Sequence, residues 1–224
     1  ENMQKQEAEL QKLNEKLLKL AHKLTSIRQK AATALAEAIM TQLRELYMEK
    51  AQFVVHFDHL PDGQFDRNGA DEVVFYISTN VGEPPKPLTK IASGGELSRV
   101  MLALKTIFSS TMGITSIIFD EVDTGVSGRV AQAIADKIAA VSIHSQVLCI
   151  SHLPQVAAMA DHHYHIQKDE DQQRTYTSLR EIEGNERIDE LSRMMSGPEI
   201  TEKTFLHAKE LVEIANERKK EFQL

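Results

Sequence analysis

The chain has 224 residues, of which 42% are hydrophobic and 26% are charged. A chain of this size and composition forms one large domain, or one domain with an appendage, and disorder of the whole chain is excluded. The 26 Lys and Arg residues are outnumbered by 33 Asp and Glu residues, which gives a net charge of -7. A uniformly basic nucleic-acid binder is therefore excluded, although a local basic face is not.

Three features favour a soluble cytoplasmic protein. Cys149 is the single cysteine, so no internal disulfide can form and a reducing compartment is the simpler interpretation. No apolar run approaches the roughly 18 residues that a membrane-spanning helix needs. The opening sequence ENMQKQEAEL is polar and lacks the apolar core of a signal peptide.

Residues 1–50 contain no Gly or Pro, and apolar residues repeat within them at alternating spacings of three and four. This repeat is typical of a coiled coil, whose seam has to pair with another helix. We expect a coiled-coil arm, and a long surface helix lying on its own domain is the alternative. The seam consists of Leu10, Leu13, Leu17, Leu20, Leu24 and Ile27.

Residues 51–224 have the pattern of an α/β domain. Alternating apolar residues at 52–60 and 71–79, with Pro-Asp-Gly and Asn-Gly between them, predict an antiparallel pair of strands. The proline-rich stretch 81–90 predicts an extended connector.

The second half of the chain predicts a parallel sheet. Short apolar runs at 116–119 and 147–150, with a helix between them at 130–141, suit strands of a parallel sheet that is covered on both faces. The remaining pattern predicts a hairpin and two helices, at 164–168 with 175–182, 187–195 and 201–222.

A Ser-Gly-Gly turn at 93–95 leads into a strongly helical run from Glu96 to Phe108. Glycines at a helix start let the backbone approach a ligand, and the free N–H groups and the helix dipole favour a phosphate there. The Ser93 hydroxyl can add a hydrogen bond. An ordinary loop with a helix cap is the alternative, and for this tripeptide alone it is the better interpretation.

Asp120 and Glu121 follow the predicted strand 116–119, which places two carboxylates at the C-terminal edge of the sheet. Ligands of α/β proteins bind at that edge. In a nucleotide hydrolase the first carboxylate helps to hold Mg²⁺ and the second orients the attacking water. An acidic strand end facing solvent is the alternative.

His152 follows the predicted strand 147–150 and is therefore expected at the same sheet edge as Glu121. A histidine there can donate to a γ-phosphate or to the attacking water. A histidine satisfied by the local backbone is the alternative, and for a single motif it is the better one.

Together, the segments KIASGGELSRVMLALK, SIIFDEVDTGVSG and CISHLPQVAAMADHHYHI resemble the signature, Walker B with D-loop, and H-loop of ABC-type ATPases. They are similar to the SMC-like branch, whose two ATPase lobes lie at opposite ends of a coiled coil, and within it to the RecN family of bacterial DNA repair proteins.

The resemblance implies ATP and Mg²⁺ as cofactors, with Asp120 holding Mg²⁺, Glu121 as the catalytic carboxylate and His152 as the switch histidine. It also implies that the signature residues contact the ATP held by a second protomer, namely Ser93, Gly94, Gly95 and Glu96. Asp123 is implied to bind nucleotide from the D-loop, whose polar turn could touch the same site or a facing subunit.

No G-x-x-x-x-G-K-[ST] sequence occurs in the chain, so nothing in it can wrap a triphosphate as a P-loop does. The family keeps that loop in an N-terminal lobe on the other side of the coiled coil. We therefore interpret residues 1–50 as the end of the descending arm and residues 51–224 as the C-terminal lobe of the head. By itself, the chain is expected to bind ATP weakly and not to hydrolyse it.

The family further implies ATP-driven pairing of two heads, release on hydrolysis, DNA binding, a nucleoid-associated place in the cytoplasm, and recombinational repair of double-strand breaks. Two alternatives stay open, a head from another SMC-like ATPase of chromosome organisation and a structural module without turnover. The DTGVSG and SHLPQVAAMA segments disfavour the first, and the intact Asp-Glu pair with His152 disfavours the second.

Overall fold

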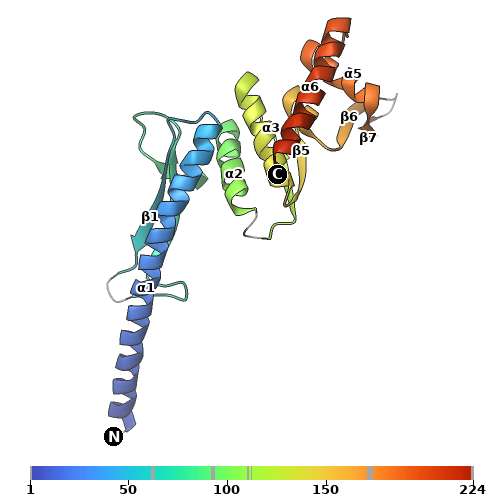
Figure 1. Ribbon diagram of the computed structural model, residues 1–224. Helices are drawn as coiled ribbons and strands as arrows, with labels where there is room; N and C mark the ends of the chain where they lie inside the picture. The colour runs from blue at the N-terminus through green and yellow to red at the C-terminus, as the bar shows by residue number, and fades with distance from the viewer. Residues whose placement is uncertain are drawn as a thin grey trace. The chain divides into compact units, whose positions relative to one another are not determined.

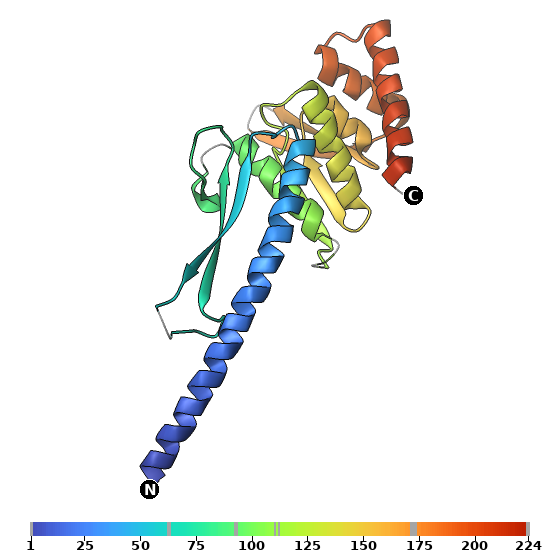
Figure 2. The same cartoon turned by 60° about the vertical axis from the view of Figure 1, so that its left-hand side comes forward.

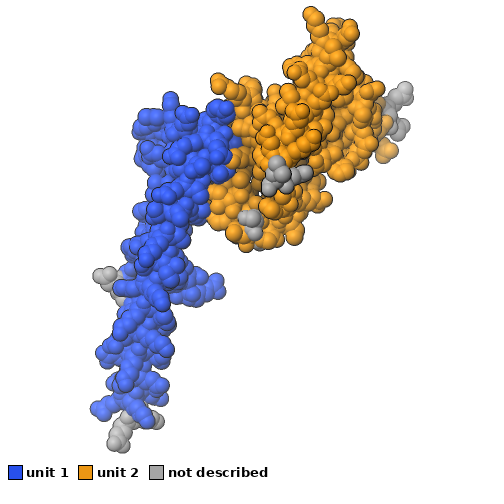
Figure 3. All heavy atoms as spheres, in the orientation of Figure 1, with its two compact units in different colours: residues 1–92 blue, residues 93–224 orange. Residues whose placement is uncertain are grey.

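The computed structural model describes residues 2–61, 64–91, 94–109, 111, 113–170 and 174–222. It divides into two compact units, residues 1–92 and residues 93–224, which Figure 3 colours separately. The antiparallel strands thus belong to the same unit as the long helix. The boundary predicted at residue 50 divides the arm from the head lobe. It is not the division between the two compact units, and it stays a prediction.

Unit 1 is a long helix that runs along an antiparallel hairpin, as Figures 1 and 2 show. The register pairs Gln52 with Ser78 and His59 with Asp71, which confirms the predicted pair of strands. The proline-rich connector is not wholly extended, because it adds two residues to the sheet and then makes a helical turn. The elements are α1 (Asn2–Glu45), β1 (Gln52–His59), β2 (Asp71–Ser78), β3 (Lys86–Pro87) and η1 (Leu88–Lys90).

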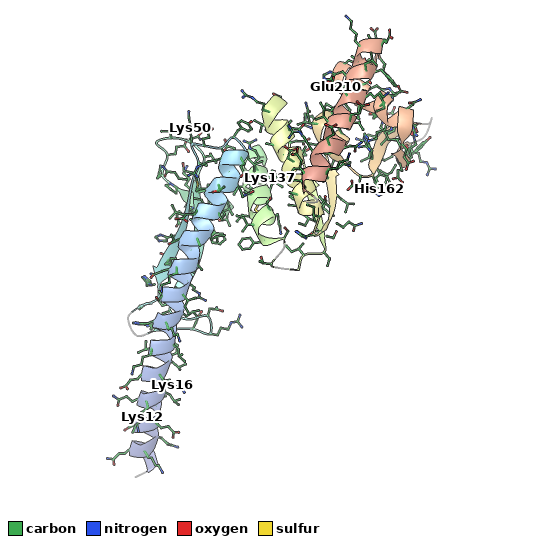
Figure 4. All side chains as sticks on the ribbon, viewed as in Figure 1. Lys12, Lys16, Lys50, Lys137, His162 and Glu210 are labelled. Carbon is green, nitrogen blue, oxygen red and sulfur yellow. The ribbon has the colours of Figure 1, made fainter. Side chains whose placement is uncertain are left out.

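The α1 helix has two apolar stripes with different environments. One stripe packs along β1 and is buried, with Ile39 and Leu43 at its C-terminal end. The other is the predicted seam from Leu10 to Ile27, whose members are all exposed. The N-terminal part of the helix, where Figure 4 labels Lys12 and Lys16, extends beyond the hairpin. The prediction of a helix is confirmed. The six seam residues are exposed among the described residues, although Leu24 lies beside Gly69 in the loop between β1 and β2.

Unit 2 is built on a parallel strand–helix–strand motif, β4–α3–β5, in which Ser116 pairs with Gln146 and Asp120 with Ile150. The predicted parallel strands, C-terminal hairpin and last two helices are confirmed, while the short helix α4 was not predicted. The elements are α2 (Gly94–Phe108), β4 (Ser116–Asp120), α3 (Gly128–Ser142), β5 (Gln146–Ile150), α4 (Pro154–Met159), β6 (His163–Glu170), β7 (Thr175–Ile182), α5 (Gly184–Ser196) and α6 (Glu202–Phe222).

The two faces of the β4–β5 sheet differ in burial. On one face Ile117 and Phe119 are buried, together with the α3 residues Ile134 and Ala135. On the other face Ile118, Leu148 and Ile150 are 69%, 49% and 51% exposed. The prediction of cover on both faces is therefore wrong for the described part of the chain. The strands are apolar on both sides, but these residues supply helices for one side only.

The C-terminal helix α6 is tied to the rest of unit 2 by two ion pairs. Arg218 Nη1 lies 2.7 Å from Asp136 Oδ2 on α3, and Lys219 Nζ lies 3.0 Å from Asp161 Oδ1 in the loop after α4. These contacts fix α6 against the elements that follow β4 and β5. Within the described ranges, no helix combines the length and the apolar character needed to cross a bilayer.

Candidate functional site

The predicted site residues after β4 and β5 meet at one edge of the parallel sheet. Because Asp120 pairs with Ile150, the residues that follow these strand ends leave the sheet side by side. Asp120 and Glu121 are both exposed at this edge. Glu121 adopts a left-handed backbone with φ of 52°, which is uncommon for a residue with a side chain and is found at functional turns.

The turn after β4 carries a buried carboxylate. The side chain of Asp123 is fully buried, and its Oδ2 accepts a hydrogen bond from the Ser151 hydroxyl. His152 Nδ1 lies 3.6 Å from Asp123 Oδ1, and the histidine side chain is 67% exposed. His152 is thus observed at the sheet edge that also carries Glu121, where the sequence placed it. Ser151, which stands directly before the histidine, was not among the predicted site residues.

The signature glycines begin α2, and one of them touches the same turn. A Cβ atom on Gly95 would lie 2.7 Å from the carbonyl oxygen of Thr124, so only glycine fits without a shift of the backbone. A Cβ on Gly94 would meet nothing within 4 Å. The sequence predicted that these glycines approach a ligand, and for Gly95 the close neighbour within the chain is the backbone of the turn after β4.

The remaining signature residues lie on either side of these glycines. Glu96 is in the first turn of α2, while Ser93 lies outside the described residues. Burial lowers the pKa of Arg99, one turn further along, and the nearby charge of Glu96 acts in the opposite direction. The described part of the signature therefore carries charges of both signs beside the helix start.

Burial and nearby negative charges at this sheet edge keep the thiol of Cys149 protonated. Burial, followed by the negative charges of Asp123 and Asp120, raises the pKa of Cys149 to about 12. Because the thiolate is the nucleophilic form, this cysteine is inert at neutral pH. It serves as a small packing residue of β5.

Arg187 is a second residue with a role that was not predicted from the sequence. Its Nη2 donates to three carbonyl oxygens at the end of α4, those of Ala157 at 3.2 Å, Ala158 at 2.9 Å and Ala160 at 2.8 Å. The Ala157 carbonyl also accepts from the backbone N–H of Ala160 at 3.3 Å, and the other two carbonyls lie where the helix ends and no further turn supplies donors. Arg187 on α5 therefore holds the short helix that begins two residues after His152.

Solved structures of Smc heads match this fold. An Smc head domain with a coiled coil and joint from Pyrococcus yayanosii has a TM-score of 0.60 over 86% of this chain and 35% of that chain, at 18% identity. An Smc head domain with an extended coiled coil from Pyrococcus furiosus has a TM-score of 0.52 over 80% of this chain and 42% of that chain, also at 18% identity. The chain therefore shares the fold of part of an SMC-type head.

The sequence relatives identify the family. The DNA repair protein RecN of Halalkalibacterium halodurans is 60% identical over 194 residues, which cover 86% of this chain and 34% of the relative. RecN of Bacillus subtilis is 50% identical over 97% of this chain and 40% of the relative. RecN of Haemophilus influenzae is 39% identical over 90% of this chain and 36% of the relative. No protein-family model matches the chain.

The chain belongs to the RecN family and is a part of such a protein. It spans only 34% to 40% of the length of these relatives. Most of the length of a RecN protein thus lies outside the residues described above.

Proposed function

We propose that this chain supplies half of a composite ATPase site in a full-length RecN protein. The observation that carries the proposal is the convergence of three motifs in unit 2. Asp120 and Glu121 end β4, the turn after them packs on Gly95, and His152 lies beside that turn. Exposed carboxylates, a histidine and a helix N-terminus at one sheet edge suit the binding and hydrolysis of a nucleoside triphosphate.

The residues after β4 fit a magnesium-dependent reaction. Asp120 is exposed at the strand end, and Mg²⁺ usually takes one or two protein carboxylates, with water and phosphate oxygens as its other ligands. When bound, the ion would neutralise charge on the phosphates. Glu121 orients the attacking water and accepts its proton, and His152 donates a hydrogen bond to the terminal phosphate.

The start of α2 serves the nucleotide held by a second protomer. Gly94, Gly95 and Glu96 provide backbone N–H groups at the positive end of the helix dipole, where a phosphate is favoured. Ser93 would add its hydroxyl, and Asp123 belongs to the D-loop of the same interface. The contact between Gly95 and Thr124 supports this arrangement, because it makes the signature and the D-loop one continuous surface.

The N-terminal lobe of the same protein would bring the phosphate-binding loop that this sequence lacks. The apolar face formed by Ile118, Leu148 and Ile150 supports this proposal, since parallel sheets are found covered on both faces. The relatives are long enough to include such a lobe, because the chain spans 34% to 40% of them.

The exposed leucine seam of α1 supports a coiled-coil arm. A helix this long cannot bury its seam alone, and the spacing from Leu10 to Ile27 suits pairing with a second helix. We assign that helix to the outgoing arm of the same protein, which would connect the two lobes.

The biological setting follows from the family. The relatives are named DNA repair proteins, and we extend that role to this chain as part of a RecN protein of the bacterial cytoplasm. Two ATP molecules would join two heads, hydrolysis would release them, and DNA would bind the full-length dimer during recombinational repair of double-strand breaks. Nucleoid association would follow from DNA binding.

The test is Glu121→Gln in the full-length protein. Loss of the carboxylate should lower ATP turnover by about 10²–10⁴-fold while ATP-bound dimers persist in size-exclusion chromatography. Glu72→Gln is the matched control, because Glu72 is exposed on β2 and should leave turnover unchanged. Hydrolysis by Glu121→Gln at the parental rate, or turnover by the isolated 224-residue chain, would contradict the proposal.

A further inference from the structure

One oxygen of the Asp123 carboxylate accepts no hydrogen bond from the described residues. Its Oδ2 accepts the Ser151 hydroxyl, but its Oδ1 is buried and has no hydrogen-bond partner among the described residues. His152 Nδ1 lies 3.6 Å from that oxygen, slightly beyond hydrogen-bond distance. A buried carboxylate oxygen without a donor is costly in free energy, and such groups are rare except where a reaction uses them.

Ser151 connects this carboxylate to the backbone that carries the histidine. Its hydroxyl donates to Asp123, and its Oγ accepts a hydrogen bond of 3.0 Å from the backbone N–H of Leu153. The two bonds bracket His152, because Ser151 precedes it and Leu153 follows it. The histidine side chain is itself 67% exposed, so its direction depends on how this short loop is held.

We propose that Ser151 is a positioning residue, which fixes the loop so that Nδ1 of His152 faces Asp123 and Nε2 faces the nucleotide. A carboxylate beside one ring nitrogen selects the tautomer that leaves the other nitrogen for the substrate. The gap of 3.6 Å would close to a hydrogen bond when nucleotide is bound, since such bonds tighten in the reacting complex. This inference rests on the proposed function, because it acts through His152.

The experiment measures steady-state ATP hydrolysis by the full-length protein with Thr or Val in place of Ser151. The two side chains have the same shape, but only Thr keeps the hydroxyl. Ser151→Thr should retain kcat within about threefold, while Ser151→Val should lose about ten- to a hundredfold in kcat with little change in KM. Ser151→Ala removes the hydroxyl without added volume, and it should show the same loss in kcat as Val.

A double mutant separates positioning from a structural role. If Ser151 acts through His152, then Ser151→Ala should add nothing to the loss caused by His152→Ala. Ser192→Ala is the matched control, because Ser192 is a fully buried serine on α5 whose hydroxyl donates to Ile188 O at 2.8 Å. It should lower stability and leave kcat unchanged.

The outcomes distinguish this inference from the function on which it rests. Parental turnover by Ser151→Ala and Ser151→Val, or a loss that multiplies fully with that of His152→Ala, would overturn the role of Ser151 alone. Full turnover by Glu121→Gln, or none by the parental full-length protein, would overturn the proposed function and the inference with it. Loss of turnover in Glu121→Gln and Ser151→Val, with rescue by Ser151→Thr, would support both.

Discussion

Two buried aspartates, one in each compact unit, are held in opposite ways. In unit 1 the Asp71 side chain is fully buried, and Thr25 Oγ1 donates to it at 2.5 Å. Arg28 Nη1 lies 3.8 Å from the same oxygen, Oδ2, and His59 Nδ1 lies 2.8 Å from the other, Oδ1. In unit 2 Asp123 is buried to the same extent, but one of its oxygens has no hydrogen-bond partner among the described residues.

The difference separates a carboxylate that stabilises the folded unit from one that keeps a free acceptor oxygen. Each oxygen of Asp71 has a donor, so the charge is compensated and the group fastens the hairpin to α1. Asp123 keeps an unused acceptor beside an exposed histidine, which lowers stability but leaves an interaction for the complex with nucleotide.

The largest effect on stability is expected from Gly95→Ala. The new methyl group would lie 2.7 Å from the backbone carbonyl of Thr124, which cannot move aside as a side chain tip can. Displacing the turn should cost about 3 kcal/mol in the free energy of unfolding, at the upper end of overpacking effects. Urea denaturation of the purified chain would measure this cost.

Gly94→Ala is the matched control for that substitution. Its methyl group would meet nothing within 4 Å, and alanine is a better helix former than glycine. We expect the free energy of unfolding to stay the same or to rise by up to about 1 kcal/mol. An equal loss of stability in both variants would show that the contact between Gly95 and Thr124 is not the cause.

A smaller loss is expected from Asp71→Asn, which breaks the saturated carboxylate of unit 1. The amide cannot accept from both Thr25 and His59 and no longer offsets the charge of Arg28. The cost should be about 2 kcal/mol, less than for a fully buried ion pair because His59 is 61% exposed. Hydrogen exchange of the β1 and β2 amides measures this loss of stability. Asp58→Asn is the control, because Asp58 lies on the exposed side of β1, and it should cost under about 0.5 kcal/mol.

The same carboxylate makes the stability of unit 1 depend on pH. Burial alone would raise the pKa of Asp71. The hydrogen bonds from Thr25 and His59, together with the positive charges of His59 and Arg28, bring the pKa below its ordinary value. A lowered pKa contributes stability that is present above about pH 3.9 and is lost as the pH falls through the folded value. The difference between the parent and Asp71→Asn should therefore shrink in acid, and a difference that stays constant down to pH about 2 would contradict this origin.

Much of the architecture could be predicted from the sequence because it depends on local patterns. The alternation at 52–60 and 71–79 predicted the β1–β2 pair, and the apolar runs before Asp120 and Ser151 predicted the parallel strands. The helix α4 has only six residues, too few for a helical repeat to be recognised. Apolar strands also indicate that both faces need cover, but not whether this chain supplies it.

The contacts that organise the site could not be predicted, because they join residues far apart in the sequence. Gly95 meets Thr124, and Ser151 meets Asp123, across segments whose distance no periodicity specifies. The glycine motif predicted that the backbone closely approaches a ligand, whereas in the structure Gly95 closely approaches Thr124. The role of Ser151 depends on the parallel register of β4 and β5, which brings its hydroxyl to the D-loop.

The smallest perturbation uses Cys149 as a probe of the Asp123 charge. With its pKa raised to about 12, the native thiol should react with a disulfide reagent at pH 8 far more slowly than the unfolded chain, whose cysteine has an ordinary pKa of about 8.5. Asp123→Asn removes one of the charges that disfavour the thiolate, so native labelling should become faster. Asp161→Asn, at an exposed carboxylate paired with Lys219, should leave the rate unchanged. Rapid stoichiometric labelling of the native parent would mean that β5 opens to solvent, and the buried Asp123 turn beside it would then lose its support.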